Sequence, residues 1–339
     1  MDTNIQNGSR PGPKIAMPAF FRFTPLFKER IWGGDRLLPF KGGKNPEKAV
    51  GESWEISGVP GDETRVCGGP CDNWTLSELI ACYGTDLTGD FHVESEGPFP
   101  LLVKFIDTAQ DLSIQVHPDD STARRQGKHC GKTEMWYIVD AEPGASLLVG
   151  FNCRLTPDEY EQSVKDNTIC DKLVRYPVKQ GDCFYIPAGQ VHAIGAGIML
   201  IEIQQASDTT YRIYDYNRLG YDGKPRMLHT QEAREAIDFE HRVECPTKYD
   251  YATNRRVQLE SCPFYTTSRF DLDAPYKIDY SRHTSFALLI AYEGQAEVRC
   301  NGEATVLKAG ETLLIPAVAR EVEIIPEKNT LFRFLETYV

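Results

Sequence analysis

The chain has 339 residues, of which 41% are hydrophobic and 25% charged, an ordinary composition for a globular protein of about two domains. Its net charge of -12 argues against a protein that binds nucleic acid or an anionic membrane surface, and no apolar run is long enough to span a bilayer. Residues 1–19 read as a polar tail without signal-peptide features, which predicts a cytoplasmic protein whose ten cysteines stay reduced.

Short apolar segments separated by glycine, proline and aspartate make up most of the chain. We predict strands, in chain order, at residues 100–107, 112–118, 134–140, 146–151, 183–188, 198–205 and 210–216. Short strands at close spacing are typical of a β-sandwich or barrel. The residues after 246 show the same pattern, so the fold class is mainly β.

Three helices interrupt the strands. We predict them at residues 75–84, 156–166 and 230–239. The first begins with Thr75 and Glu78 in the spacing of a capping box. The second repeats this spacing with Thr156 and Glu159, and Pro157 stands in its first turn.

The predicted strand 112–118 has two different faces. Its apolar residues are Leu112, Ile114 and Val116, and its polar residues are Ser113, Gln115 and His117. Successive side chains of a strand point to opposite faces, so the three polar side chains lie in one row. We expect the apolar row to pack outside the barrel, against helices or a second unit, and Pro118 to end the strand.

A similar β-unit occurs twice in the chain. The segment GDCFYIPAGQVHAI from Gly181 resembles GETLLIPAVAREVEI from Gly310, and the strands upstream of the two segments are also alike. The first copy has Glu134 and His192 where the second has Thr284 and Glu321. We therefore expect the chemistry in a first unit, residues 20–245, and a second unit without it at 246–339.

A set of metal-ligand residue types gathers in the first copy. Gln115 and His117 share one strand face, Glu134 lies on another strand, and His192 follows the turn after 183–188. Two imidazoles, a carboxylate and an amide oxygen suit Zn²⁺ or another borderline divalent metal. The absence of cysteine from the set favours a catalytic site over a closed structural one.

The other five histidines are weaker candidates for metal ligands. His129 is a rival ligand in a polar segment that we expect to be exposed. The remaining four are His92, His229, His241 and His283, and structural roles are expected for them.

Several of these segments match a known family. GDCFYIPAGQVH follows the second cupin motif, and LSIQVHPDD, GKTEMWYI and SDTTYRIYDYNR, with the N-terminal blocks RIWGGDRL and GESWEISG, resemble type I mannose-6-phosphate isomerase in its short bacterial form. The resemblance runs from about Phe20 to Arg218, with a cupin-like continuation to the end. It implies two cupin-like jelly-roll β-barrel units with a few short helices.

The resemblance also implies an activity and a set of site residues. The family isomerises mannose 6-phosphate to fructose 6-phosphate with Zn²⁺, one ion per chain. Its metal ligands correspond to Gln115, His117, Glu134 and His192. Its other active-site positions correspond to Lys104, Lys132, Asp208 and Arg212. Gly131 stands where some longer members have a histidine, so a ring-opening role for that histidine does not carry over.

Isomerisation through a cis-enediol needs a base near C1 and C2, charge stabilisation and a phosphate anchor. Lys132 shares strand parity with Glu134 and is the first candidate base, with Glu202 as an alternative if it faces inward. Arg212 could hold the enediolate or the phosphate, and Asp208 could orient Arg212 or shuttle a proton. Ser113 and Lys104 are candidate phosphate contacts. Each of these residues could instead have no catalytic role and simply form a salt bridge or lie exposed to solvent.

Two other functions fit parts of the pattern. A cupin oxygenase with Fe²⁺ would use His117, Glu134 and His192 as a facial triad but would not need Lys132 and Arg212 beside them. A sugar-binding protein with a degenerate cupin would have lost the ligands, as only the second copy has. The sequence is silent on oligomeric state and on the physiological direction of the reaction.

Overall fold

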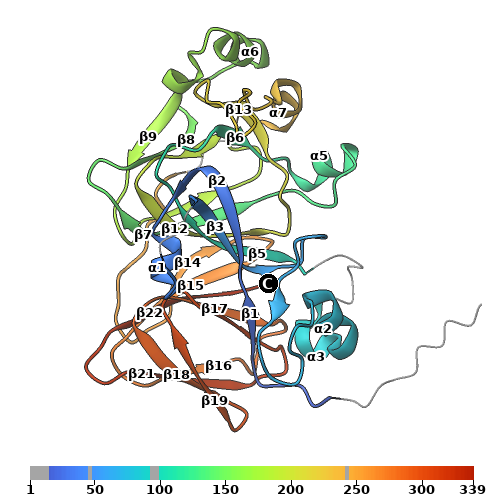
Figure 1. The fold of residues 1–339 in the computed structure, drawn as a ribbon, viewed down its shortest axis with the longest axis vertical. Coiled ribbons are helices and arrows are strands. Elements are labelled where there is room, and N and C mark those ends of the chain that lie inside the picture. Colours follow the sequence, from blue (N-terminus) through green and yellow to red (C-terminus); the bar gives the residue numbers. More distant parts are fainter. Residues whose placement is uncertain (1–14, 45–47, 92–98, 241–243) are drawn as a thin grey trace, which may run out of the picture.

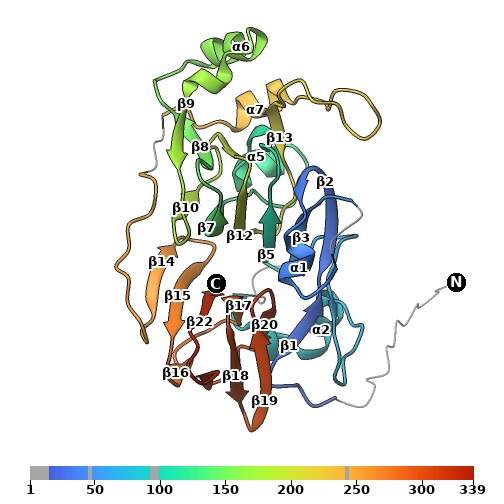
Figure 2. The same ribbon diagram turned by 60° about the vertical axis from the view of Figure 1, so that its left-hand side comes forward.

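The computed structural model describes residues 15–44, 48–91, 99–240 and 244–339. These residues form four antiparallel sheets, two in an N-terminal unit and two in a C-terminal unit (Figures 1 and 2). In the described part of the chain, no helix is long and apolar enough to cross a membrane.

The N-terminal unit contains a six-stranded and a five-stranded sheet. The six-stranded sheet has the order β10 (Cys183–Ile186), β7 (Glu134–Ala141), β12 (Ile198–Gln205), β5 (Leu101–Asp107), β3 (Val50–Ser57), β2 (Leu26–Gly34). The five-stranded sheet has the order β13 (Tyr211–Tyr214), β6 (Ile114–Val116), β11 (His192–Ile194), β8 (Ser146–Phe151), β9 (Leu173–Pro177).

The C-terminal unit contains a seven-stranded and a four-stranded sheet. The seven-stranded sheet has the order β14 (Val257–Ser261), β15 (Thr266–Leu272), β22 (Phe332–Tyr338), β17 (Ala287–Glu293), β20 (Thr312–Ile315), β1 (Phe21–Thr24), β4 (Arg65–Val66). The four-stranded sheet has the order β16 (Tyr276–Asp279), β21 (Glu321–Pro326), β18 (Gln295–Cys300), β19 (Glu303–Lys308).

Short helices lie at the edges of these sheets. They are α1 (Leu37–Phe40), α2 (Leu76–Tyr83), α3 (Thr85–Thr88), α5 (Asp120–Arg125), α6 (Pro157–Lys165), the 3-10 helix η1 (Ile169–Lys172) and α7 (Thr230–Ala236). The three predicted helices are confirmed, and both predicted capping boxes form, at Thr75 with Glu78 and at Thr156 with Glu159.

The internal repeat is visible in the strand order. The run β10-β7-β12-β5 of the N-terminal unit corresponds to β20-β17-β22-β15 of the C-terminal unit. Each repeated segment begins at a glycine with positive φ, Gly181 and Gly310, a conformation that side chains with a Cβ rarely adopt. The mainly β, cupin-like prediction is therefore confirmed.

Two N-terminal strands belong to the C-terminal unit. β1 and β4 lie near the N-terminus, yet β1 pairs with β20 in the sheet of the C-terminal unit and β4 pairs with β1. We propose to keep the division of the chain at residues 245 and 246, with these two N-terminal strands contributed to the second unit. Most of the expected polar tail, 1–19, lies outside the described residues.

The predicted strand 112–118 is shorter than expected. Only Ile114–Val116 forms β6, and the Asp119 side chain accepts a hydrogen bond from the Thr122 amide to start α5, a helix that we did not predict. Ile114 and Val116 pack against α6 and α7 outside the barrel, as expected. The prediction for Leu112 is wrong: it precedes the strand, and its side chain joins the core inside the barrel.

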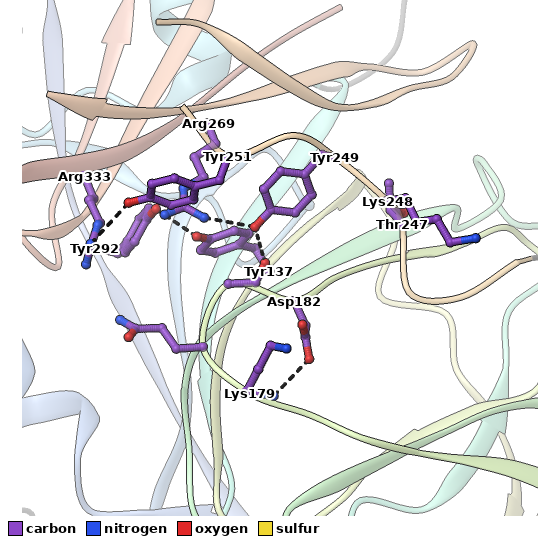
Figure 3. A pocket seen from close by; sticks show the side chains of 12 residues that line it. Tyr137, Lys179, Asp182, Thr247, Lys248, Tyr249, Tyr251, Arg269, Tyr292 and Arg333 are labelled. Atoms are coloured by element: carbon purple, nitrogen blue, oxygen red, sulfur yellow. Dashed lines mark hydrogen bonds between the residues drawn. The ribbon is translucent and has the colours of Figure 1, made fainter. Parts of the chain in front are cut away.

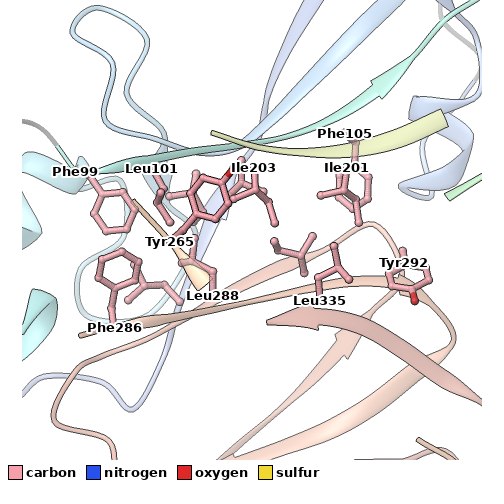
Figure 4. Packing of buried hydrophobic residues seen from close by; sticks show 14 of the residues in the cluster. Phe99, Leu101, Phe105, Ile201, Ile203, Tyr265, Phe286, Leu288, Tyr292 and Leu335 are labelled. Atoms are coloured by element: carbon pink, nitrogen blue, oxygen red, sulfur yellow. The ribbon is translucent and has the colours of Figure 1, made fainter. Parts of the chain in front are cut away.

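The two units share one apolar layer. The outer face of the six-stranded sheet packs on the seven-stranded sheet, and Figure 4 shows Leu101, Ile203 and Phe105 opposite Leu288 and Leu335. All five side chains are fully buried. Separating the units would expose this surface to water, so the hydrophobic effect holds them together.

A polar cluster closes the edge of this layer. Asp271 accepts two hydrogen bonds from Arg269, at 2.6 and 2.8 Å, and a further one from Arg333 at 2.9 Å. The Arg269 guanidinium also donates to the Tyr249 hydroxyl (Figure 3), which in turn donates to the Gly181 carbonyl of the first unit. The cluster therefore links the second unit to the turn that begins the first unit's repeat.

Replacing Asp271 with alanine is expected to lower the free energy of unfolding by about 3–5 kcal/mol, because Arg269 would be left buried without its carboxylate. Urea unfolding followed by circular dichroism measures the change. The exposed Asp273, two residues on, is the matched control, and its alanine variant should lose about 1 kcal/mol or less. Equal losses in the two variants would contradict a linking role for Asp271.

Candidate metal centre and active site

Two rows of polar side chains face each other inside the N-terminal barrel. In the five-stranded sheet, Gln115 of β6 is paired with His192 on one side and with Arg212 on the other. In the six-stranded sheet, Glu202 of β12 is paired with Lys104 of β5. Directly paired residues of antiparallel strands point to the same face, so strand register alone builds both rows.

Three of the predicted ligands meet at one point. The ligand atoms of His117, Glu134 and His192 lie within 4.8 Å of one another, and all three residues are buried. The Nε2 atoms of the two histidines are 3.4 and 3.3 Å from the Glu134 carboxylate. This His–Glu–His site is the single metal-binding group of this kind among the described histidines, cysteines and acids.

The backbone fixes both imidazole rings for ligation. His117 Nδ1 lies 2.9 Å from the Thr209 carbonyl oxygen, and His192 Nδ1 lies 2.8 Å from the Gln190 carbonyl oxygen. A carbonyl only accepts hydrogen bonds, so each Nδ1 carries the proton and each Nε2 keeps a lone pair that can coordinate a cation beside the Glu134 carboxylate.

The electrostatics of the site keep its ligands in the forms that bind metal. Burial and the nearby Lys132 ammonium lower the pKa of His117 to about 3, and burial also lowers the pKa of His192. Burial alone would raise the pKa of Glu134, but Lys132 and the two histidines hold it well below its ordinary value. Neutral imidazoles and an ionised carboxylate are the states that coordinate a divalent cation.

The residues present fit a metal ion. His192 Nε2 and Glu134 Oε1 are buried and have no hydrogen-bond partner among the described residues. Buried polar atoms are normally paired, so two unpaired ones that face each other fit the coordination of a shared cation. Gln115 lies beside His192 in the same row and lines the cavity above this point, where its amide oxygen can complete a four-coordinate set.

A cavity of about 490 Å³ lies next to the His–Glu–His site, and one of its lining residues, Lys132, contacts both Glu134 and His117. The predicted residues that line it are Lys104, Ser113, Gln115, Lys132, Asp208 and Arg212. Its volume is in the range of small-molecule sites. The structure thus brings the non-ligand residues predicted from the sequence into one pocket with the metal centre.

Lys132 is held close to the metal ligands. Its Nζ lies 2.6 Å from Glu134 Oε2, 3.0 Å from His117 Nε2 and 3.9 Å from Glu202 Oε1. Burial alone would lower the pKa of Lys132, but Glu134 and Glu202 together raise it above the ordinary value. Lys132 is thus positioned to donate hydrogen bonds to Glu134 and His117.

Glu202 faces inward, the condition under which it was an alternative base. Its carboxylate accepts hydrogen bonds from Lys104 Nζ at 2.7 Å and from Trp136 Nε1 at 3.0 Å. The residue is buried, yet it lines the cavity. Glu202 therefore presents a carboxylate to the cavity between two lysine ammonium groups.

Asp208 and Arg212 are not partners. Asp208 precedes β13, so strand parity with Arg212 does not apply to it, and it lies exposed at the rim of the cavity. Arg212 makes no ion pair within the described residues; its Nη1 donates to the Met227 carbonyl at 2.9 Å. The role of Asp208 in orienting Arg212 therefore finds no support in these contacts.

Sequence reasoning missed the wall that β2 and β3 add to the cavity. Glu52 accepts two hydrogen bonds from Arg30, at 3.1 and 3.0 Å, and one from Trp54 Nε1 at 2.7 Å. The blocks RIWGGDRL and GESWEISG contain these residues and were noticed only as resemblances. Alternating residues in GESWEISG place Glu52 and Trp54 on one face, a signal that could have been used.

The other histidines agree with their expected roles where they are described. His129 is exposed and lies outside the metal-binding group. His229 Nδ1 accepts a hydrogen bond from the Arg212 amide at 3.1 Å, and His283 packs between Tyr280 and Tyr338. His92 and His241 lie outside the described residues.

Comparison with known proteins agrees with this geometry. Residues 20–144 match the family "Phosphomannose isomerase type I, catalytic domain", and residues 256–330 match "Mannose-6-phosphate isomerase, cupin domain". Mannose-6-phosphate isomerase ManA of Bacillus subtilis is 35% identical over 305 residues, which cover 88% of this chain and 93% of that protein. The mannose-6-phosphate isomerase of Streptococcus mutans is 33% identical over 298 residues, 86% of this chain and 92% of that protein.

A solved structure supports the same assignment. The crystal structure of the mannose 6-phosphate isomerase from Bacillus subtilis superposes with a TM-score of 0.86 at 30% identity, covering 95% of this chain and all of the other. Sequence identity and fold agree over nearly the full length, and the two family matches lie within it. The chain therefore belongs to the type I phosphomannose isomerases, which interconvert mannose 6-phosphate and fructose 6-phosphate.

Proposed function

We propose that the chain carries out this isomerisation through a cis-enediol, with one Zn²⁺ per chain held by Gln115, His117, Glu134 and His192. The observation that carries the proposal is the buried His–Glu–His site next to a cavity lined by lysine, glutamate and arginine. Zinc is favoured over harder cations because two of the four ligands are imidazole nitrogens. When bound, the ion would polarise or orient the sugar oxygens.

The proposed proton carrier is Glu202. Moving a proton between C1 and C2 needs one group that both removes and returns it on one face of the enediol. Glu202 lines the cavity and has hydrogen-bond donors on either side, so its carboxylate is held in place. This replaces Lys132, our first candidate, because Lys132 Nζ is already directed at the metal ligands Glu134 and His117.

Lys132 and Lys104 are proposed to stabilise negative charge. Both ammonium groups line the cavity beside Glu202, where they can donate hydrogen bonds to the enediolate oxygens as charge develops there. Ser113 is proposed as a further substrate contact on the opposite wall. Asp208, exposed at the rim, is proposed to exchange protons with solvent.

The function is tested with the purified chain and three sugars. Proton NMR should show conversion of mannose 6-phosphate to fructose 6-phosphate, and far slower conversion of mannose and glucose 6-phosphate. Equal rates with mannose would show that the phosphate is not recognised. No conversion by the zinc-loaded protein would overturn the proposal.

Replacing Lys132 with alanine should lower kcat by about 10²–10³-fold, the usual effect of removing one group that stabilises developing charge. Bound zinc, measured by mass spectrometry of the native protein, should be retained because Lys132 is not a ligand. Normal turnover in this variant would remove Lys132 from the mechanism. Loss of zinc would make it a residue that supports the metal centre.

We also propose that the protein works in the reducing cytoplasm. All ten cysteines are unpaired in the structure, so the fold uses no disulfide. Reductant should accordingly leave the melting temperature unchanged.

A further inference from the structure

The charges around the cavity are unevenly paired. Four of its cations each have at least one carboxylate partner: Lys28 with Asp62, Arg30 with Glu52, Lys104 with Glu202, and Lys132 with Glu134 and Glu202. Arg212 has no carboxylate partner among the described residues, and its buried Nε lacks a hydrogen-bond acceptor there. The unpaired positive charge of the cavity therefore lies at Arg212.

A second arginine stands beside Arg212. The loop between β13 and α7 folds back so that Arg226 lines the cavity, and the Met227 carbonyl next to it accepts a hydrogen bond from Arg212. Arg226 donates to both oxygens of Asp215, at 2.6 and 2.5 Å. Arg218 donates to the same carboxylate at 2.7 Å. Arg226 and Arg218 thus share a single carboxylate, which leaves the neighbouring Arg212 without one.

This excess of charge is local, since the whole chain has a net charge of -12. Burial and the positive charges of Arg226 and Arg218 lower the pKa of Arg212, although Asp215 opposes this. A guanidinium group stays protonated in proteins nonetheless. Such a cluster is stabilised when a dianion enters it, and arginine forks match the oxygens of a phosphate group.

The loop itself is braced by its own backbone. The Gly220 amide donates to the Lys224 carbonyl at 2.7 Å, and Leu219 and Pro225 form an isolated β-bridge. Asp215 accepts two hydrogen bonds from the Arg226 side chain, so the guanidinium is held at the cavity before any ligand binds. A pre-positioned cation loses little side-chain entropy on binding.

We propose that Arg212 and Arg226 bind the phosphate group of the hexose 6-phosphate, and that Asp215 positions Arg226 for this task. The inference rests on the proposed function and deepens it. It assigns the phosphate to the wall formed by β13 and its following loop, rather than to Lys104, whose ammonium is already paired with Glu202.

The order of the strands indicates how the bound substrate is oriented in the cavity. His192, Gln115 and Arg212 are neighbours on three adjacent strands, which lie about 4.8 Å apart. Arg212 is therefore two strand spacings from His192 and one from Gln115. A sugar whose C1 and C2 lie near Glu202 carries its phosphate at the other end of the carbon chain, toward the arginines.

The matched pair of variants is Arg226→Gln and Arg218→Gln. Both remove one guanidinium from Asp215, but Arg226 lines the cavity and Arg218 is not among its lining residues. Arg226→Gln should raise KM for mannose 6-phosphate by about 10–100-fold, the effect of losing hydrogen bonds to a charged group, with kcat little changed. Arg218→Gln should change KM by no more than about threefold.

Inorganic phosphate separates this inference from the proposed function, because its binding needs no turnover. Calorimetry should show phosphate binding to the wild-type protein and at least about tenfold weaker binding to Arg226→Gln, with Arg226→Lys in between. Asp215→Asn should weaken phosphate binding in the same direction. Unchanged phosphate binding and KM in Arg226→Gln, or equal losses in both glutamine variants, would overturn the assignment.

Discussion

Replacing His192 with alanine is expected to remove both the bound metal and turnover. His192 contributes one of the two imidazole nitrogens, and its Nε2 is buried and 3.3 Å from Glu134 Oε1. Loss of a direct ligand should cost more than the about 10–100-fold drop that follows loss of an outer partner of a metal ligand. Metal content by mass spectrometry and kcat by NMR measure the two effects.

The control for this variant is His129→Ala, since His129 is exposed and outside the metal-binding group. It should keep wild-type metal content and kcat. Circular dichroism shows whether the His192 variant retains its β-sheet content. A folded His192→Ala protein that still turns over mannose 6-phosphate would rule out the ligand assignment.

Replacing Glu202 with glutamine is expected to lower kcat by about 10²–10⁴-fold while the metal stays bound. Glutamine has nearly the same shape and still accepts a hydrogen bond from Lys104, but it cannot take a proton from carbon. In deuterated water, the wild-type enzyme should incorporate deuterium into the carbon-bound positions of product, and this exchange should fall in parallel with kcat.

Glu55→Gln is the matched control for the Glu202 variant. Glu55 is also a buried glutamate paired with a lysine, Lys41, at 2.9 Å, but it does not line the active-site cavity. Its glutamine variant should change stability without changing deuterium exchange per turnover. If Glu202→Gln kept normal exchange and kcat, the proton would have to be carried by another group.

Much of the fold could be predicted because its signals are local. The capping boxes at Thr75 and Thr156 and the apolar strands are each specified by a few adjacent residues. The repeat revealed the second unit through Gly181 and Gly310. The strand β1 could not be predicted in its place, because its partner β20 is far away in the sequence and nothing local specifies that pairing.

The residues of the candidate site also divide into those that local sequence predicts and those that it does not. Alternation put Gln115 and His117 on one face, and the metal-binding group of His117, Glu134 and His192 follows from residue types that suit one cation. The choice between Lys132 and Glu202 as proton carrier required the three-dimensional structure, because it depends on which side chains surround each group. Arg226 was missed because a loop, without periodicity, brings it to the cavity.

The central claim is that the buried His–Glu–His site holds the zinc on which isomerisation depends. The most direct measurement is a chelation and reconstitution series that records zinc per chain and the rate of fructose 6-phosphate formation in the same samples. We predict that activity falls with zinc content, is lost in the metal-free protein and returns at one zinc per chain. Full activity in the metal-free protein would contradict the account.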